Sequence, residues 1–231
     1  MNSRQKEIID FLKNGSKSIK EISHSLYVGE MTVRRELKIL EDEGLVTKYR
    51  GIVALSPEST DVSYELRRDV LQGEKVELSK RAMQYLDKDQ LIFIDGSTTC
   101  RHLVSELAKY KTSAVVTNSL MLALELSRKG VKVKIVPGNI DDFEKAVVGP
   151  DAIRYLENFN FDLAFFSAKG FDDEIITDNN EEQISIRKTV MERSKKSIYM
   201  MDSSKKDKRY PYTIAKNEDI ILIEIDDKNY E

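Results

Sequence analysis

Residues 91–99 read Leu-Ile-Phe-Ile-Asp-Gly-Ser-Thr-Thr, four apolar residues followed at once by an acid, a glycine and three hydroxyl side chains. A short apolar run of this kind is typical of a buried strand in a parallel sheet. The polar residues after it have two interpretations. Ser97 or Thr98 can cap the next helix, or the hydroxyls and backbone N–H groups can hold an anion at a helix N-terminus. This segment alone leaves both open.

The same alternation continues from residue 90 onward. Apolar stretches predict strands at 91–94, 114–117, 131–136, 163–166, 197–201 and 220–225, and amphipathic stretches predict helices at 99–108, 119–129, 150–158 and 181–193. Short apolar strands that alternate with amphipathic helices indicate an α/β fold with a mostly parallel sheet covered on both faces. We assign residues 89–231 to this domain.

Ligands bind such sheets beyond the carboxyl ends of the strands. The residues that directly follow the predicted strands are small, hydroxylated or charged, and they include Asp95, Gly96, Ser97, Thr98, Thr99, Thr117, Asn118, Gly138, Lys169 and Gly170. Four polar strand ends at one edge of a sheet predict a pocket for a small, polar, anionic ligand.

The first 55 residues follow another plan. Ser18 and Glu21 form the sequence of a capping box at the start of a second helix, and residues 31–43 have the spacing of a third. Residues 45–55 read as two short strands around a turn. Three short helices followed by a hairpin are the plan of a winged helix-turn-helix, which we assign to residues 1–56.

The third helix has one apolar face and one basic face. At 100° per residue, Val33, Leu37 and Leu40 share the inward face. Recognition helices contact bases and phosphates with the opposite side, where arginine can bind guanine edges or phosphate. Taken in isolation, Arg34 and Arg35 would be read as solvated helix residues that pair with Glu30 or Glu41. The helix-turn-helix spacing favours DNA binding, and the predicted contact residues are Thr32, Arg34, Arg35, Lys38, Lys48, Tyr49 and Arg50.

The segment VGEMTVRRELKILEDEGLVTKYRG (28–51) resembles the DNA-binding head of DeoR-type regulators, bacterial repressors that sense phosphorylated sugars. Residues 32–37 match the family's Thr–aliphatic–Arg–Arg–acid–Leu core. Two positions depart from the family pattern. Gly29 stands where the family usually has a cap serine, and residues 49–51 stand where it usually has His-Gly-Gly.

The larger domain resembles the effector-binding half of the same family. The matching segments are IDGSTT (94–99), VVTNSL (115–120), VGP (148–150), FDLAFFSAKG (161–170), EEQISIRKTV (181–190) and DSSK (202–205). The resemblance implies a sheet like that of ribose-phosphate isomerase, used here for sensing. It also implies that Glu181, Lys188 and Lys205 border the ligand cavity. Gly96 and Ser97 stand in the opposite order from the family's usual phosphate loop.

Composition limits the remaining classes. The chain has 231 residues, of which 40% are apolar and 33% charged, as in ordinary globular proteins. No apolar run approaches the roughly 20 residues of a membrane span, and no signal peptide is recognisable. A single cysteine, Cys100, fits the cytoplasm. This cysteine and the two histidines lack the spacing of zinc ligands, so we expect no metal and no cofactor. Residues 57–88 read as a polar hinge (56–63) and a helical linker.

The leading hypothesis is a cytoplasmic repressor that binds double-stranded operator DNA under the control of a phosphorylated sugar. One small head buries too little DNA to be selective, so we expect a homo-dimer or homo-tetramer. The alternative is a phosphosugar isomerase with an appended DNA-binding head. Asp95, Lys169, Glu181 and Lys188 could supply a base and an electrophile, yet no compact acid pair is present. We therefore predict a protein that is not an enzyme.

Overall fold

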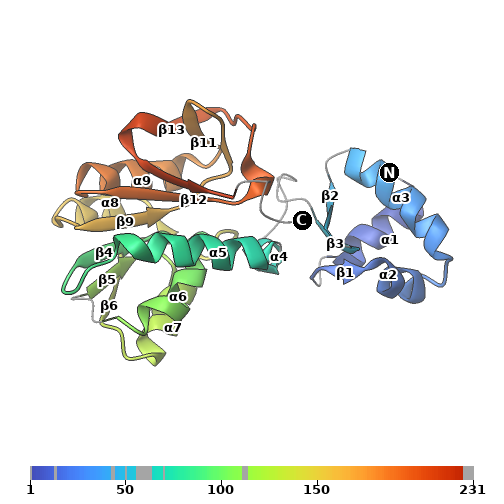
Figure 1. Ribbon diagram of the computed structural model, residues 1–231, viewed down its shortest axis with the longest axis horizontal. Coiled ribbons are helices and arrows are strands. Elements are labelled where there is room, and N and C mark those ends of the chain that lie inside the picture. The colour runs from blue at the N-terminus through green and yellow to red at the C-terminus, as the bar shows by residue number, and fades with distance from the viewer. Residues whose placement is uncertain are drawn as a thin grey trace. The chain divides into compact units, whose positions relative to one another are not determined.

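The computed structural model describes residues 2–12, 15–42, 45–49, 51–55, 64–69, 71–110 and 114–225. The chain divides into two compact units, Met1–Gln72 and Gly73–Glu231 (Figure 1). This division falls within the predicted linker of residues 57–88. The predicted hinge at 56–63 lies outside the described residues.

The first unit is a small helical domain with a three-stranded sheet. Its helices are α1 (Ser3–Leu12), α2 (Ile19–Ser25), α3 (Glu30–Asp42) and α4 (Tyr64–Asp69), and its strands are β1 (Lys17–Ser18), β2 (Val46–Tyr49) and β3 (Ile52–Leu55). β3 pairs antiparallel with both β1 and β2. Three helices, a hairpin and the predicted capping box at Ser18 and Glu21 are all present, so the predicted winged helix-turn-helix is confirmed.

The inward face of α3 holds this unit together. Val33, Leu37 and Leu40 are fully buried, as the spacing predicts, and they pack in one core with residues of α1, α2 and both hairpin strands. Glu36 is also buried, and its carboxylate accepts hydrogen bonds from the side chains of Asn2 at 3.0 Å and Gln5 at 3.1 Å. These bonds fix α3 against α1, so its outer face has a defined orientation within the unit.

The second unit is built on a six-stranded parallel sheet with the order β14-β12-β9-β4-β5-β6. The strands are β4 (Leu91–Ile94), β5 (Ala114–Thr117), β6 (Val133–Ile135), β9 (Leu163–Phe166), β12 (Ser197–Met201) and β14 (Ile221–Glu224). The six strands predicted from the apolar runs are these six. The predicted α/β class with a parallel sheet is confirmed.

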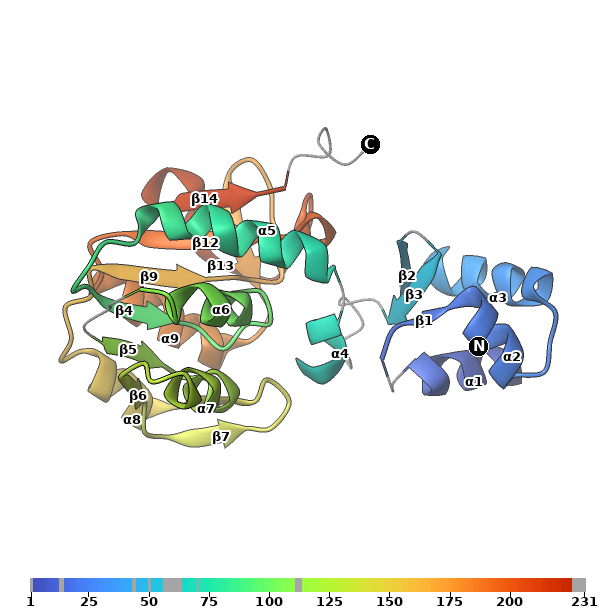
Figure 2. The ribbon, with the colours of Figure 1, turned by 60° about the horizontal axis from the view of Figure 1, so that its bottom comes forward.

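Helices cover both faces of this sheet (Figures 1 and 2). They are α5 (Gln72–Ala82), α6 (Leu103–Leu107), α7 (Leu120–Arg128), α8 (Pro150–Leu156) and α9 (Glu181–Glu192), with short 3-10 turns η1 (Met83–Tyr85), η2 (Cys100–His102), η3 (Ser203–Lys205) and η4 (Asn217–Asp219). Apolar residues of α5, α6 and α7 pack on one face of the sheet, and those of α8 and α9 pack on the other. The predicted apolar positions of the linker, Leu78, Ala82, Met83 and Leu86, lie in the first of these cores.

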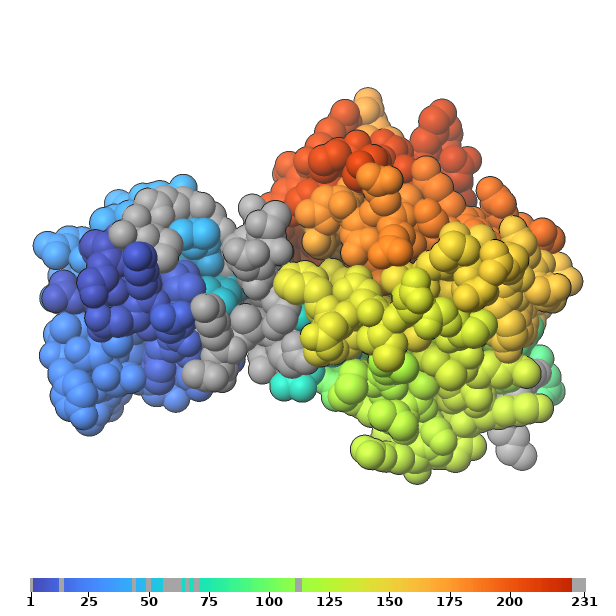
Figure 3. Space-filling model, turned by 180° about the vertical axis from the view of Figure 1, so that it is seen from behind, coloured from blue at the N-terminus to red at the C-terminus, as the bar shows by residue number. Residues whose placement is uncertain are grey.

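Two smaller β-structures were not predicted. β7 (Asn139–Asp141) and β8 (Ala146–Val148) form a hairpin, and β10 (Gly170–Phe171), β11 (Ile175–Asp178) and β13 (Tyr212–Lys216) form an antiparallel sheet. Together with α8 and α9, the hairpin contributes to the yellow-to-orange surface in Figure 3. β7, β8 and β10 have only two or three residues, too few for a periodic pattern to reveal them. β11 and β13 are as long as the predicted strands, but they mix polar with apolar residues. Within the described ranges, no helix has the length and apolar character needed to cross a membrane.

Candidate functional site

The first candidate site is the outer face of α3. The side chains of Arg34 and Arg35 are 56% and 72% exposed, and Lys38 is also exposed. Arg34 lies 3.6 Å from Glu30, and Arg35 lies 3.5 Å from the buried Glu36. The exposed pair of Arg34 with Glu30 is weak. The guanidinium of Arg35 is exposed, and the buried Glu36 also accepts hydrogen bonds from Asn2 and Gln5. Both guanidinium groups can therefore exchange a carboxylate for a phosphate or a base edge.

The wing contributes one described cation. Lys48, in β2, pairs with Glu41 of α3 at 2.7 Å, which ties the wing to the helix. Tyr49 ends β2, and the predicted contact residue Arg50 lies outside the described residues. Thr32 is half-buried near the start of α3.

Sequence reasoning missed one residue on this face. Tyr27, in the turn between α2 and α3, is 95% exposed and has a positive φ of 52°. Met31, in the first turn of α3, is 78% exposed. A positive φ is uncommon for tyrosine, and the exposed ring gains no packing energy that would offset the strain. Tyr27 lies in a turn, where no periodic pattern of apolar residues could single it out.

The second candidate site lies at the centre of the large sheet. β4 is the first strand of the sheet in the chain; β5 and β6 follow on one side of it, whereas β9, β12 and β14 lie on the other. The topological switch point therefore falls between β4 and β9, and in open α/β sheets ligands bind beyond the carboxyl ends at this point. Asp95 follows β4 and Ser167 follows β9, and the Ser167 N–H donates to Asp95 Oδ2 at 3.4 Å.

Asp95 organises the loop that follows β4. Its Oδ1 accepts the Ser97 N–H at 3.0 Å, and its Oδ2 accepts Arg187 Nε at 3.1 Å. The same guanidinium donates to Asp178 at 2.7 Å. Burial would lower the pKa of Arg187, but Asp178 and Asp95 outweigh it and raise that pKa. Two buried carboxylates therefore share one buried cation, and the carboxylate of Asp95 does not confront an incoming anion uncompensated.

The next two residues of the loop each meet a lysine. Lys75 Nζ, from α5, donates to Thr98 Oγ1 at 3.2 Å, and Lys205 Nζ donates to Thr99 Oγ1 at 3.1 Å and to Ser167 Oγ at 2.6 Å. Asp202 lies 3.1 Å from Lys205. Burial would raise the pKa of Asp202, but Lys205 and Lys75 hold it at about 2. Hydroxyl groups and two ammonium groups thus converge on one short loop.

The predicted helix at 99–108 is interrupted. Residues 100–102 form the 3-10 turn η2, and α6 covers only Leu103–Leu107. Ser97 Oγ accepts the Cys100 N–H at 3.1 Å, as a helix cap would. A helix this short contributes little dipole charge. The positive charge at the loop comes from Lys75 and Lys205 instead of a helix end.

Asn118 and Thr117 lie beside this loop or shape the neighbouring turn, whereas Gly138 packs against β8. A Cβ on Gly96 would lie 3.6 Å from Asn118 Oδ1, so Asn118 borders the loop. Thr117 Oγ1 accepts the Ser119 N–H at 3.0 Å and shapes the turn after β5. Gly138 has a φ of 146°, and a Cβ there would lie 2.5 Å from the Val148 carbonyl. This glycine is required by the close approach of two backbones.

The remaining predicted residues lie on α9 and at the start of the small sheet β10–β11–β13, and the charge of Lys169 helps to lower the pKa of Asp178. Lys169 donates to Asn179 at 2.7 Å, and a Cβ on Gly170 would collide with the Lys208 carbonyl at 2.4 Å. Glu181 is exposed and accepts the Tyr212 hydroxyl. Lys188 is exposed on α9, whose buried side carries Gln183 and Arg187 instead.

Sequence reasoning passed over three residues of the cluster: Lys75, Arg187 and Asp202. Lys75 lies in a charged helix and Arg187 in a surface-like pattern, so neither stands out by spacing. The strand-end rule selects Ser167 among the residues that follow β9, although it was not named as a ligand residue. Applied to β12 as well, the rule would also select Asp202.

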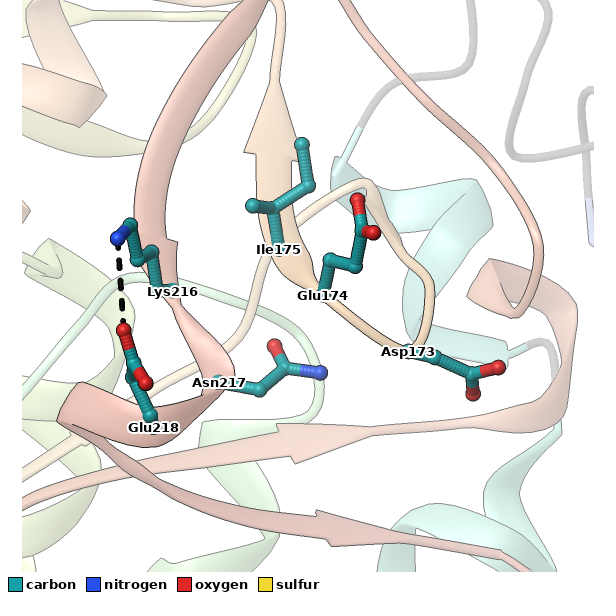
Figure 4. A pocket seen from close by; sticks show the side chains of 6 residues that line it. All are labelled: Asp173, Glu174, Ile175, Lys216, Asn217 and Glu218. Carbon is teal, nitrogen blue, oxygen red and sulfur yellow. Dashed lines mark hydrogen bonds and ion pairs between the residues drawn. The ribbon is translucent and has the colours of Figure 1, made fainter.

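A hollow of about 370 Å³ lies elsewhere on this unit (Figure 4). It is lined by Asp173, Glu174, Ile175, Lys216, Asn217 and Glu218. Ile175 begins β11, whereas Asp178, which holds Arg187, ends it. Three acidic residues and one lysine suit an anion poorly, and none of the predicted ligand residues lines this hollow.

Two family models match this chain, one in each of its two compact units. Residues 4–59 match the family described as "DeoR-like helix-turn-helix domain", and residues 71–227 match "DeoR C terminal sensor domain". The HTH-type transcriptional regulator GlpR of Haloferax volcanii is 30% identical over 225 residues, which cover 95% of this chain and 87% of that protein. The lactose phosphotransferase system repressor of Staphylococcus epidermidis is 28% identical over 198 residues, with coverages of 84% and 78%.

A solved structure of ribose 5 phosphate isomerase A from Neisseria gonorrhoeae is similar with a TM-score of 0.45 and 16% identity. The similarity covers 62% of this chain and 55% of the isomerase. The relatives that match along most of this chain are named as transcriptional regulators, and both domain types of one family occur in the expected order. The chain therefore belongs to the DeoR family of helix-turn-helix transcriptional regulators.

Proposed function

We propose that this chain is a cytoplasmic repressor of a carbohydrate-metabolism operon, and that a phosphorylated sugar bound in the second unit controls its affinity for operator DNA. The observation that carries the proposal is the loop at Thr98 and Thr99, where each hydroxyl lies at hydrogen-bond distance from a lysine ammonium group. The name of the Staphylococcus epidermidis relative, which refers to a lactose phosphotransferase system, supports a role in carbohydrate metabolism.

Phosphate suits this loop for chemical reasons. Its oxygens accept charge-assisted hydrogen bonds, and Lys75, Lys205 and the hydroxyl of Thr98 are donors, whereas the Thr99 hydroxyl donates to Asp202 at 3.4 Å. In the structure these lysines hold the pKa of Asp202 at about 2 against the effect of burial. The same positive field would favour a phosphate dianion placed beside the loop.

The route from the ligand to the DNA-binding unit begins at α5. This helix is the first element after the division at Gln72–Gly73, and it carries Lys75 in its first turns. A phosphate that binds Lys75 weakens the hydrogen bond between Lys75 and Thr98. The position of the first turn of α5 can change as a result. The ligand can shift the protein only by as much as its affinity differs between two arrangements of the DNA-binding units.

Operator binding in this proposal uses α3 and the wing. Arg35, the most exposed of the two recognition-helix arginines, reads a base edge, while Arg34 and Lys38 contact phosphates. A homo-dimer or homo-tetramer places two or more heads on repeated half-sites and supplies the selectivity that one head lacks.

The proposal is tested with Thr98→Val, which removes one hydroxyl and preserves the side-chain shape. The lost charge-assisted bond should cost about 1.5–3 kcal/mol of effector affinity, roughly ten- to a hundredfold. Operator affinity without effector should stay at the wild-type value, because the heads belong to another unit. The measurement is fluorescence anisotropy on DNA from upstream of the chain's own operon, with and without a panel of sugar phosphates.

An unchanged effector response in Thr98→Val would mean that the hydroxyl only accepts the hydrogen bond from Lys75 of α5 and does not contact the effector. Turnover of ribose 5-phosphate is followed in the same samples. Turnover at enzymatic rates would reject the regulator hypothesis in favour of an isomerase. Arg35→Ala should weaken operator binding by about 1–3 kcal/mol and relax base preference at one position; equal affinity for every sequence variant of the operator in wild type and mutant would reject the base contact.

A further inference from the structure

The first turn of α9 carries a glutamine that meets Asn118 after β5. Asn118 Nδ2 donates to Gln183 Oε1 at 3.2 Å and to the Val147 carbonyl at 3.3 Å. A carbonyl can only accept, so the nitrogen of Asn118 must be the atom that faces Val147. Gln183 must then present its oxygen to Asn118. The bonds therefore fix the orientation of both amides.

Each amide also has a second polar atom, Oδ1 in Asn118 and Nε2 in Gln183. Asn118 is 0% exposed and Gln183 is 5% exposed, yet Asn118 Oδ1 and Gln183 Nε2 have no hydrogen-bond partner among the described residues. Buried polar atoms are nearly always hydrogen-bonded. An unpaired acceptor in one amide beside an unpaired donor in the other matches a hydroxyl group, whose oxygen can accept from Nε2 while its hydrogen is donated to Oδ1.

The pair borders the loop after β4. The position that a Cβ on Gly96 would take lies 3.6 Å from Asn118 Oδ1, so the unpaired acceptor faces this loop. Arg187, one turn after Gln183 on the buried side of α9, donates to Asp95 at 3.1 Å. The amide pair and the cluster of Thr98 and Thr99 therefore flank one short segment of backbone.

We propose that Asn118 and Gln183 together bind a hydroxyl group of the effector, so that the site recognises the carbon skeleton of a phosphorylated sugar or polyol as well as its phosphate. This inference rests on the proposed function, because it assumes that the phosphate lies at Thr98 and Thr99. A site with a buried donor and acceptor discriminates against any ligand that lacks the hydroxyl, since both protein groups then stay unpaired.

The test compares Gln183→Met with the wild-type full chain by melting-shift titration. The ligands are inorganic phosphate, ribose 5-phosphate, glycerol 3-phosphate, glucose 6-phosphate, fructose 1-phosphate and fructose 6-phosphate, with chloride at matched ionic strength as the blank. We expect the wild type to bind at least one organic phosphate more tightly than inorganic phosphate. The variant should lose at least tenfold of that preference and keep its affinity for inorganic phosphate.

Two further variants make the result specific. Gln183→Glu keeps the oxygen that Asn118 needs and replaces the Nε2 donor by an acceptor oxygen that shares a negative charge, so it should lose the same preference even if methionine is not tolerated. Its affinity for inorganic phosphate measures the effect of the added charge. Glu182→Met, an exposed neighbour on α9, should behave as the wild type.

Several outcomes would overturn the inference. One is an equal loss for inorganic and organic phosphates in the folded Gln183 variants, which means a structural role. Another is no loss for any ligand, which means that a buried water occupies the position. A wild type without preference for any organic phosphate also contradicts it. Thr98→Val separates the two proposals: if it binds inorganic phosphate like the wild type, the phosphate site and the proposed function fail, whereas a loss there with unchanged preference in the Gln183 variants refutes the hydroxyl contact alone.

Discussion

Replacing Arg187 by methionine tests the charge balance behind the ligand loop. Arg187 Nε lies 3.1 Å from Asp95, and a terminal nitrogen lies 2.7 Å from Asp178. All three side chains are buried. Methionine fills much of the same volume but leaves two carboxylates without their cation. Breaking a buried ion pair from one side costs about 3–5 kcal/mol, so we expect a loss in this range at pH 7 and a melting temperature lower by roughly 6–20 °C.

The loss should depend on pH in a defined direction. Arg187, together with Lys169, opposes the effect of burial and keeps the pKa of Asp178 below its usual value of 3.8. Without Arg187 the pKa of Asp178 rises, so the folded variant takes up a proton at a higher pH than the folded wild type. The deficit of Arg187→Met relative to wild type should therefore shrink as pH falls through this raised pKa, by at most about 1.4 kcal/mol for each pH unit.

The assay is differential scanning calorimetry of the full chain between pH 5 and 8, because the two units can unfold separately. Lys188→Met makes the same chemical change at the next, exposed position and should shift stability by less than about 0.5 kcal/mol. Arg187→Met with Asp178→Asn removes one of the orphaned charges and should recover part of the loss. A stability within 1 kcal/mol of wild type for Arg187→Met, with an unchanged pH profile, would refute the reasoning.

Three other changes test separate parts of the structure. Tyr27→Gly should raise the stability of the first unit by about 0.5–1 kcal/mol, because glycine tolerates the positive φ, and should weaken operator binding in anisotropy titrations; weakening without stabilisation would contradict the strain argument. Lys205→Met should destabilise the second unit by about 3 kcal/mol in calorimetry by leaving Asp202 uncompensated, and adding Asp202→Asn should restore most of this; no rescue would show that the ion pair is not the cause. Burial, Lys75 and Arg101 lower the pKa of His102 from 6.5 to about 4. As pH drops from 6.5 to 4, the unfolded chain therefore gains a proton before the folded chain does, and stability should fall. His102→Gln should flatten this part of the pH–stability curve, and a curve that keeps the wild-type slope would exclude His102 as its source.

Local patterns were sufficient for most of the framework. The buried face of α3 follows from helical periodicity, because Val33, Leu37 and Leu40 recur with the period of the helix. Most strands of the parallel sheet follow from apolar runs, since a strand buried on both faces needs no alternation. The edge strand β6 is mostly exposed, and its segment 131–136 carries two lysines. The hairpin β7–β8 and the sheet β10–β11–β13 escaped this reasoning. Their strands have two to five residues and pair over polar segments, where neither period can be recognised.

By itself, the sequence determined the two domain types, the parallel strands and their polar ends, because each depends on residues close together along the chain. It selected the loop Asp95–Thr99 and Asn118 in this way, whereas Lys205 came from the resemblance to the family. Only the tertiary structure decided which strands are neighbours, and so brought Ser167 of the β9 end against Asp95 of the β4 end. The same is true of Lys75 with Thr98 and of Arg187 with Asp95. The physical reason is that strand order and helix placement depend on packing between distant segments, and a periodic pattern records only which side of an element is buried, not which partner buries it.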